Sequence, residues 1–267
     1  MDTMKKILFV ASEAVPFIKT GGLADVVGSL PKYLDKRYFD ARVILPKYMC
    51  MKEEIRNSLE YIGDFYIDYA GTSKYVGVLK KELDGVTFYF IDNEDYFQKR
   101  PAMTKDELGN DYPDNGERAI FFARGVLETV KKLRWTPDII HCQGWMTSVI
   151  PFYVKTAYKD EPQFASSKVI TSLFAEQPQS NLGENFKQCL EFREIKAGSL
   201  KKYGDNFDFM ELGKLAIDYS DGVISTSNNV NLDLIDYAKT SKASFFEHSV
   251  DDTDLKEKYS EFYNNII

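Results

Sequence analysis

The sequence predicts an α/β fold built on a doubly wound parallel sheet, and three observations support this prediction. Short buried strands alternate with amphipathic helices along most of the chain. A glycine pair follows the first strand and opens a helix, which is typical of parallel sheets. The 267 residues are 44% hydrophobic and 28% charged, as in ordinary globular domains. A chain of this length forms one large domain, or one domain with a small appendage.

Apolar runs bounded by turn residues predict the strands, and apolar residues at helical spacing predict the helices. The expected strands span residues 6–11, 41–46, 86–91, 137–142, 168–173 and 222–225. Alternating apolar residues between 59 and 81 predict antiparallel strands or a hairpin around Gly71-Thr72. The expected helices span residues 23–34, 117–133, 145–158, 207–219 and 228–238, and residues 99–116 are expected to form a long loop. We expect residues 1–240 to form the domain and residues 241–267 to form a closing helix or tail that docks on it.

The charge balance and the cysteines exclude several classes of partner and site. Asp plus Glu total 41 against 34 Lys plus Arg, a net charge of −7, so neither nucleic acid nor an anionic membrane is an expected partner. No apolar run reaches the roughly 20 residues needed to cross a bilayer, and the N-terminus lacks a signal-peptide pattern. The three cysteines have no CxxC spacing, so we expect no zinc site or disulfide framework, and a cytoplasmic location.

The histidines and most of the aromatic residues are expected to be structural. The two histidines, His141 and His248, are far apart in the sequence, so no metal, cofactor or His-based triad is expected. His141 ends a predicted strand, and we expect it to be packed and hydrogen-bonded rather than catalytic. The 17 tyrosines and 19 phenylalanines are expected mainly in the core. Only an exposed cluster would indicate carbohydrate binding, and residues 61–75 are the segment to inspect for one.

The loop after the first strand is the main candidate site. It reads Lys19-Thr20-Gly21-Gly22, and glycine lets the main chain approach a ligand closely. Backbone N–H groups at a helix start carry partial positive charge, and Lys19 adds a mobile ammonium group beside them. The loop is therefore expected to bind an anion, although a tight turn with a solvated lysine would show the same residues. It is not a Walker A loop, because the order of glycine and lysine is wrong.

The longer string over residues 19–26, Lys-Thr-Gly-Gly-Leu-Ala-Asp-Val, resembles the bacterial glycogen and starch synthases, which extend α-1,4-glucans from ADP-glucose. The resemblance implies a Rossmann-like domain equivalent to the N-terminal half of a two-lobed GT-B glycosyltransferase. It also implies that Lys19 and the glycines face the cleft between the lobes, near the diphosphate and sugar of ADP-glucose. Asp25 corresponds to the family's aspartate in the same string.

The resemblance covers roughly residues 5–238 and is weakest between 174 and 204. Residues 90–100 are similar to the segment that supplies an aromatic residue and an arginine to the cleft wall, here Phe97 and Arg100. Residues 112–118, with Asn115 and Arg118, are similar to the entry into the family's long helix, and Trp145 follows a matching strand. The candidate ligand-binding residues are Lys19, Thr20, Gly21, Gly22, Asp25, Phe97, Arg100, Asn115, Arg118 and Trp145.

Two departures from the family separate the possible functions. The family's His-Asn pair is replaced by Leu173 and Phe174, and its His-Asp pair by Gln143-Gly144, so hydrogen-bonding and acidic groups are lost. No second glycine-rich phosphate loop follows, although the family's C-terminal lobe holds most of the nucleotide and stabilises the leaving diphosphate. We therefore expect no transferase activity from this lobe alone, and no catalytic residue is assigned.

Three hypotheses remain open at this point. In the first, the lobe pairs with a separately encoded C-terminal lobe and transfers glucose to an α-glucan; self-association is another way to cover the exposed cleft face. Alternatively, it is a binding or regulatory module that holds a glucan or sugar phosphate without turnover. In the third hypothesis the cleft is empty and only the fold is retained.

Overall fold

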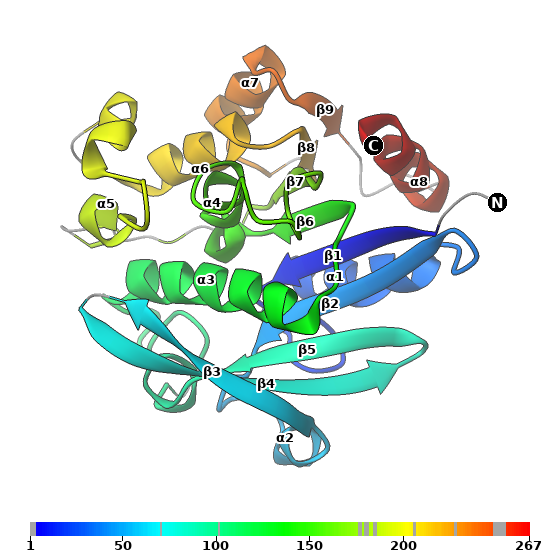
Figure 1. The fold of residues 1–267 in the computed structure, drawn as a ribbon, viewed down its shortest axis with the longest axis vertical. Coiled ribbons are helices and arrows are strands. Elements are labelled where there is room, and N and C mark those ends of the chain that lie inside the picture. The colour runs from blue at the N-terminus through cyan, green and yellow to red at the C-terminus, as the bar shows by residue number, and fades with distance from the viewer. Residues whose placement is uncertain are drawn as a thin grey trace.

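The computed structural model describes residues 4–69, 71–100, 102–175, 178, 182–183, 186–204, 207–226, 229–247 and 255–267. In this part of the chain one sheet of nine strands has the order β3-β4-β5-β2-β1-β6-β7-β8-β9 (Figure 1). The strands are β1 (Lys5–Ala11), β2 (Phe39–Pro46), β3 (Glu60–Tyr69), β4 (Thr72–Leu83), β5 (Val86–Asp92), β6 (Ile139–Gln143), β7 (Lys168–Leu173), β8 (Gly222–Ser225) and β9 (Ser244–Glu247).

Parallel pairing dominates the sheet, and only β3–β4 and β4–β5 are antiparallel. From β1 the chain passes to the neighbouring β2 and then to β3 at one edge, from which β4 and β5 lead back to β2. It then crosses to the other side of β1 and builds outward from β6 to β9. The winding direction therefore reverses between β1 and β6, as in a doubly wound sheet. The predicted fold class is confirmed, and so is the hairpin, which turns at Gly71 with a φ of +73°.

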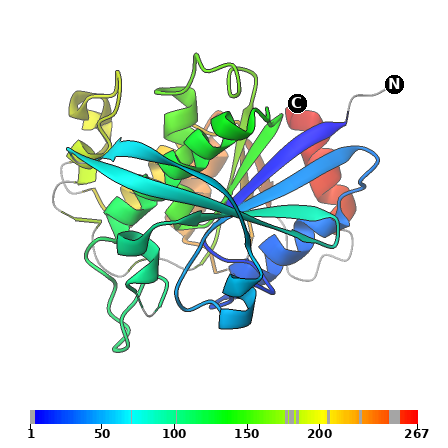
Figure 2. The ribbon, with the colours of Figure 1, turned by 60° about the horizontal axis from the view of Figure 1, so that its bottom comes forward.

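Helices cover both faces of the sheet (Figures 1 and 2). They are α1 (Gly22–Tyr33), α2 (Glu53–Asn57), α3 (Asn115–Leu133), α4 (Ile150–Lys155), α5 (Phe186–Cys189), α6 (Phe209–Asp218), α7 (Leu232–Thr240) and α8 (Leu255–Ile266). Short helices η1 (Glu94–Gln98), η2 (Trp145–Thr147) and η3 (Ala197–Tyr203) lie in the connections. Right-handed crossovers place α3, α4 and α6 on one face and α1 on the other. None of the helices in the described residues combines the length and the hydrophobicity that a bilayer-spanning segment needs.

The helix predicted over residues 145–158 is wrong, because the segment is broken. Trp145–Thr147 is a 3₁₀ turn, closed by the Thr147 amide and hydroxyl, which donate to the Gly144 carbonyl at 3.1 and 2.8 Å. A new α-helix then begins at Ile150, with Pro151 in its first turn, where a missing N–H costs nothing. The helix predicted over 228–238 is α7, which begins at Leu232, one residue after the Asn231 side chain caps the Asp233 amide at 2.9 Å.

The C-terminal region contains a strand that the sequence did not indicate. Ser244–Glu247 pairs in parallel with β8 and extends the sheet beyond residue 240. Residues 248–254, including His248, lie outside the described part of the chain. Helix α8 then packs back on the sheet through the buried Tyr259 and Tyr263. Gly222 on β8 allows this approach, because a Cβ there would lie 2.4 Å from the Ile266 side chain.

Candidate functional site

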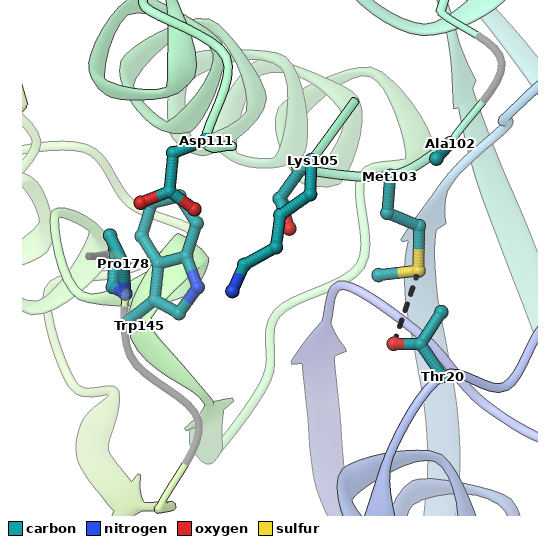
Figure 3. A pocket seen from close by; sticks show the side chains of 8 residues that line it. Thr20, Ala102, Met103, Lys105, Asp111, Trp145 and Pro178 are labelled. Carbon is teal, nitrogen blue, oxygen red and sulfur yellow. Dashed lines mark hydrogen bonds between the residues drawn. The ribbon is translucent and has the colours of Figure 1, made fainter. Parts of the chain in front are cut away.

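A pocket of about 340 Å³ lies at the edge where the parallel strands end, close to the point where the winding reverses (Figure 3). In doubly wound sheets this edge is where ligands bind. The pocket draws residues from the loop after β1, the segment before α3, the η2 turn and the loop after β7. Its lining consists of Thr20, Ala102, Met103, Thr104, Lys105, Asp111, Trp145 and Pro178. Two predicted site residues, Thr20 and Trp145, are therefore brought together here.

The bend at residues 19–22, expected to offer free amides to a ligand, already holds an anion from the chain itself. The carboxylate of Glu13 accepts the Thr20 N–H at 2.5 Å, the Thr20 hydroxyl at 2.8 Å and the Gly21 N–H at 3.1 Å. Glu13 is only 3% exposed. A negative charge is favoured at this position, because it lies at the N-terminus of α1. Glu13 is not among the residues predicted from the sequence, although an acidic residue between the first strand and the glycine pair was a visible signal.

The charged residues of the bend are paired with each other. The Lys19 ammonium contacts the Asp25 carboxylate at 2.7 Å, and both side chains are about half exposed. An exposed pair of this kind contributes little stability and can open. Gly22 begins α1 with open space where a Cβ would be, so the outer surface of the bend is accessible. Lys19, Gly21, Gly22 and Asp25 thus lie beside the pocket without lining it.

The pocket lining combines opposite charges with an aromatic ring. Lys105 and Asp111 contribute one ammonium and one carboxylate, and the Trp145 indole contributes an apolar face and an N–H group. Thr20 adds a hydroxyl group, which lies 3.9 Å from the Met103 sulfur. Figure 3 shows the side chains of Lys105 and Trp145 pointing into the same space. Such a lining suits a neutral molecule rich in hydroxyl groups, since it offers both charged donors and charged acceptors.

Asn115 and Arg118 lie behind the pocket wall rather than in the pocket. The fully buried Arg118 donates from Nε to the Tyr96 carbonyl at 2.8 Å and from Nη1 to the Asn115 Oδ1 at 2.9 Å. The Asn115 amide then donates to the carbonyl of Thr104, a pocket residue, at 2.8 Å. Burial lowers the pKa of Arg118. This chain of hydrogen bonds fixes the wall against the core.

The remaining two candidates are also placed away from the pocket lining. Arg100 pairs with Asp114 and lies over the Tyr112 ring, 4.9 Å from its centroid. Phe97 is fully buried and meets Tyr48 edge-on at 5.5 Å. Apart from Pro178, the pocket residues that were not predicted from the sequence belong to the expected loop 99–116, Met103, Lys105 and Asp111 among them. Nothing in that polar stretch indicated which of its side chains turn inward.

The two pairs that replace the family's His-Asn and His-Asp do not belong to the described lining of the pocket. Leu173 and Phe174 are buried at the end of β7. Gly144 has a φ of +79°, and a Cβ there would lie 2.5 Å from the Leu23 side chain, so an aspartate does not fit without a shift. Gln143 is fully buried, and within the described residues its amide has no hydrogen-bond partner. The described part of the chain contains no group of three or more His, Cys, Asp or Glu side chains that could hold a metal ion.

His141 is a structural residue. Its Nδ1 lies 2.8 Å from the Tyr263 hydroxyl on α8, and its Nε2 lies 2.6 Å from the Ser172 hydroxyl on β7. Burial lowers its pKa to about 3, because the charged imidazolium would lose its hydration. The prediction of a packed, hydrogen-bonded histidine is confirmed, and the neutral ring ties α8 to the sheet.

Comparison with known proteins now identifies the family. The family model described as "Starch synthase catalytic domain" matches residues 6–244. The chain belongs to this family. It is 39% identical over 249 residues to the glycogen synthase of Clostridium perfringens, covering 92% of this chain and 48% of that protein. It is 46% identical over 172 residues to the glycogen synthase of Lachnospira eligens, covering 64% of this chain and 34% of that protein.

The fold matches a solved member of the starch synthases. The catalytic domain of starch synthase IV from Arabidopsis thaliana superimposes with a TM-score of 0.72 at 20% identity, covering 92% of this chain and 51% of that one. The match confirms the prediction that the chain corresponds to one half of a GT-B glycosyltransferase. The chain spans about half the length of the first curated relative, and a third of the second.

Proposed function

We propose that this starch synthase lobe binds an α-1,4-glucan in the pocket beside Trp145, as the acceptor side of glucosyl transfer from ADP-glucose. The observation that carries the proposal is the pocket lining, which sets an indole face beside one ammonium and one carboxylate. A diphosphate would need an excess of cations and free amides, whereas the nearest amides are bound to Glu13. The related starch synthase IV was solved with both ADP and acarbose bound.

We propose further that transfer needs a second lobe, either separately encoded or part of a longer chain. Stabilising the charge on a leaving diphosphate is usually the largest catalytic contribution. The edge of the sheet beside the pocket offers few cations or free N–H groups that could do this. Leu173 and Phe174 are apolar where the resembling enzymes have hydrogen-bonding side chains. Lys19 is the one cation of the bend, and a donor could recruit it by opening the exposed pair with Asp25.

Calorimetric titration tests the glucan proposal directly. Maltohexaose and ADP-glucose are titrated into the wild type, into Trp145→Ala and into the control Tyr38→Ala, which removes an exposed tyrosine far from the pocket lining. We expect heat with maltohexaose that is lost in Trp145→Ala and kept in the control. Equal affinity in all three proteins would remove the pocket from the proposal. No heat with either ligand would favour the hypothesis that only the fold is retained.

A binding or regulatory module is the second candidate function, and the buried Leu173 and Phe174 favour it. The two candidates differ in turnover. Incorporation of labelled glucose from ADP-glucose into glycogen is measured with the purified chain, alone and mixed with the C-terminal lobe of a related glycogen synthase. Activity only in the mixture supports the first candidate, and glucan binding without activity in either supports the second. Activity of the chain alone would contradict the proposed need for a second lobe.

A further inference from the structure

A row of exposed tyrosines lies on the outer face of the β3–β4 hairpin. Tyr66 and Tyr75 are direct cross-strand partners, and their rings meet edge-on with centroids 5.8 Å apart. Tyr66, Tyr61 and Tyr75 are 65%, 54% and 37% exposed. We name these three residues the tyrosine strip. On β3 the inner face carries the buried Phe65 and Ile67, so packing in the core does not explain the exposed Tyr66 between them.

The tyrosine strip is held in place by its neighbours. The Tyr61 hydroxyl donates a hydrogen bond to the Asp64 carboxylate. Gly77 lies directly beside the Tyr75 side chain, because a Cβ at this glycine would be 3.1 Å from both the Tyr75 Cε1 atom and the Tyr75 hydroxyl oxygen. The missing side chain lets the ring lie along the sheet. An ordered aromatic surface loses little conformational entropy when a ligand binds.

A groove of about 390 Å³ continues from the strip to the end of β5. It is lined by Tyr66 and Tyr75 together with Lys74, Asn93, Glu94 and Asp95. The Asn93 amide donates to the Tyr75 carbonyl at 2.8 Å and so connects the groove to the hairpin. Because β5 runs parallel to β2 and β1, this groove lies at the same edge of the sheet as the pocket beside Trp145.

We propose that the tyrosine strip and its groove form a second contact for an α-glucan chain whose end is held beside Trp145; this rests on the proposed function. Exposed rings alternating with amide, ammonium and carboxylate groups match the apolar faces and hydroxyl groups of a polysaccharide. The cores of protein interfaces are depleted of charge, whereas this surface contains Lys74, Glu94 and Asp95. The acidic residues also disfavour a polyanion. Along β3, Tyr61 and Tyr66 are roughly 16 Å apart, which spans more than one sugar ring.

Two contacts on one polymer predict a dependence on chain length. A short oligosaccharide occupies one site at a time, whereas a long chain that occupies both gains affinity through effective concentration. The tyrosine strip is therefore expected to matter for glycogen and not for maltotriose in the pocket. The test uses affinity electrophoresis in gels containing glycogen, and calorimetry with maltotriose.

The strip variant is Tyr66→Ala/Tyr75→Ala, and Tyr66→Leu/Tyr75→Leu repeats it with side chains that keep the face covered. The matched control is Tyr33→Ala/Tyr38→Ala, since these tyrosines are 53% and 52% exposed elsewhere on the surface. Circular dichroism confirms that each variant folds. We expect both strip variants to bind glycogen about tenfold more weakly than the wild type. Their affinity for maltotriose should be unchanged, and the control should bind both ligands like the wild type.

The outcomes separate this proposal from the proposed function. Loss of glycogen binding in Trp145→Ala with wild-type binding in both strip variants would overturn the strip and leave the pocket. Loss in the strip variants with no effect of Trp145→Ala would leave the strip as the glucan site and overturn the pocket. Unchanged glycogen binding, together with loss of self-association in sedimentation by the strip variants, would assign the surface to protein contacts and reject the proposal.

Discussion

The bend at residues 19–22 and the pocket beside Trp145 are neighbours at one edge of the sheet, yet only the pocket has side chains arranged around an open volume. In the bend, amides and charges are satisfied within the chain, by Glu13 and by the pair of Lys19 with Asp25. In the pocket, polar and aromatic side chains line an open volume of about 340 Å³. A glycine-rich string can therefore mark the location of a site while its own donors have a structural role.

The largest expected effect comes from Arg118, which supports the pocket wall from behind. In Arg118→Met the buried Tyr96 carbonyl and the Asn115 side chain lose their donor, and each buried unpaired group costs about 1–3 kcal/mol. We expect the free energy of unfolding, measured in urea, to fall by about 3 kcal/mol. Maltohexaose affinity should fall as well, although Arg118 does not line the pocket. Arg37→Met, at an exposed arginine, is the control. An equal loss of stability and affinity there would show that the effect does not come from the hydrogen bonds behind the pocket wall.

The second prediction concerns His141, a buried side chain on β6 whose two ring nitrogens are both hydrogen-bonded within the chain. Its pKa is about 3 in the folded protein and 6.5 ordinarily, so the unfolded chain binds the proton more readily. Stability contributed by neutral His141 is complete above pH 6.5 and is lost as the pH falls toward 3. At pH 5 the loss is roughly 2 kcal/mol. Urea unfolding between pH 5 and 8 measures it, and His141→Asn should flatten this part of the profile.

A control is needed because other groups titrate in the same range. Lys19→Ala leaves the histidine intact and should keep the wild-type slope between pH 5 and 6.5. If His141→Asn keeps that slope too, the histidine is not buried and neutral. Glucan affinity per folded molecule should not change in this range, because His141 faces α8 and not the pocket.

The third prediction concerns Glu13, whose carboxylate accepts the N–H groups of the bend. In Glu13→Gln one oxygen still accepts a hydrogen bond, but the amide NH₂ group faces a backbone N–H, and the charge at the start of α1 is lost. We expect the free energy of unfolding to fall by about 1.5–2 kcal/mol, as for hydrogen bonds to charged groups. Titration with ADP, followed by tryptophan fluorescence, should show tighter binding, since the internal anion no longer competes. Weaker ADP binding would indicate that Glu13 orders the bend for the ligand.

The sequence predicted the sheet much better than the site. Buried strands such as Ile139–Gln143 are fixed by local apolar runs, so pattern alone located them. β9 escaped prediction because Ser244–Glu247 is a short, partly exposed edge strand whose pairing comes from β8. The pocket was missed for a related reason. Lys105 and Asp111 belong to a wall that Asn115 and Arg118 tie to the core through the Thr104 carbonyl, and such long-range hydrogen bonds leave no periodic signal.

The smallest expected effect belongs to Lys19, the residue that the motif emphasised most. Lys19→Ala removes an exposed ion pair, so the free energy of unfolding should change by less than about 1 kcal/mol. Maltohexaose affinity should stay at the wild-type value, because the lysine does not line the pocket. Asp25→Ala is the matched variant, since it frees the ammonium instead of removing it, and any ADP-glucose binding should strengthen there and weaken in Lys19→Ala. A large loss of maltohexaose binding in Lys19→Ala would mean that the bend and the pocket act as one site. It would contradict the structural role assigned to the bend.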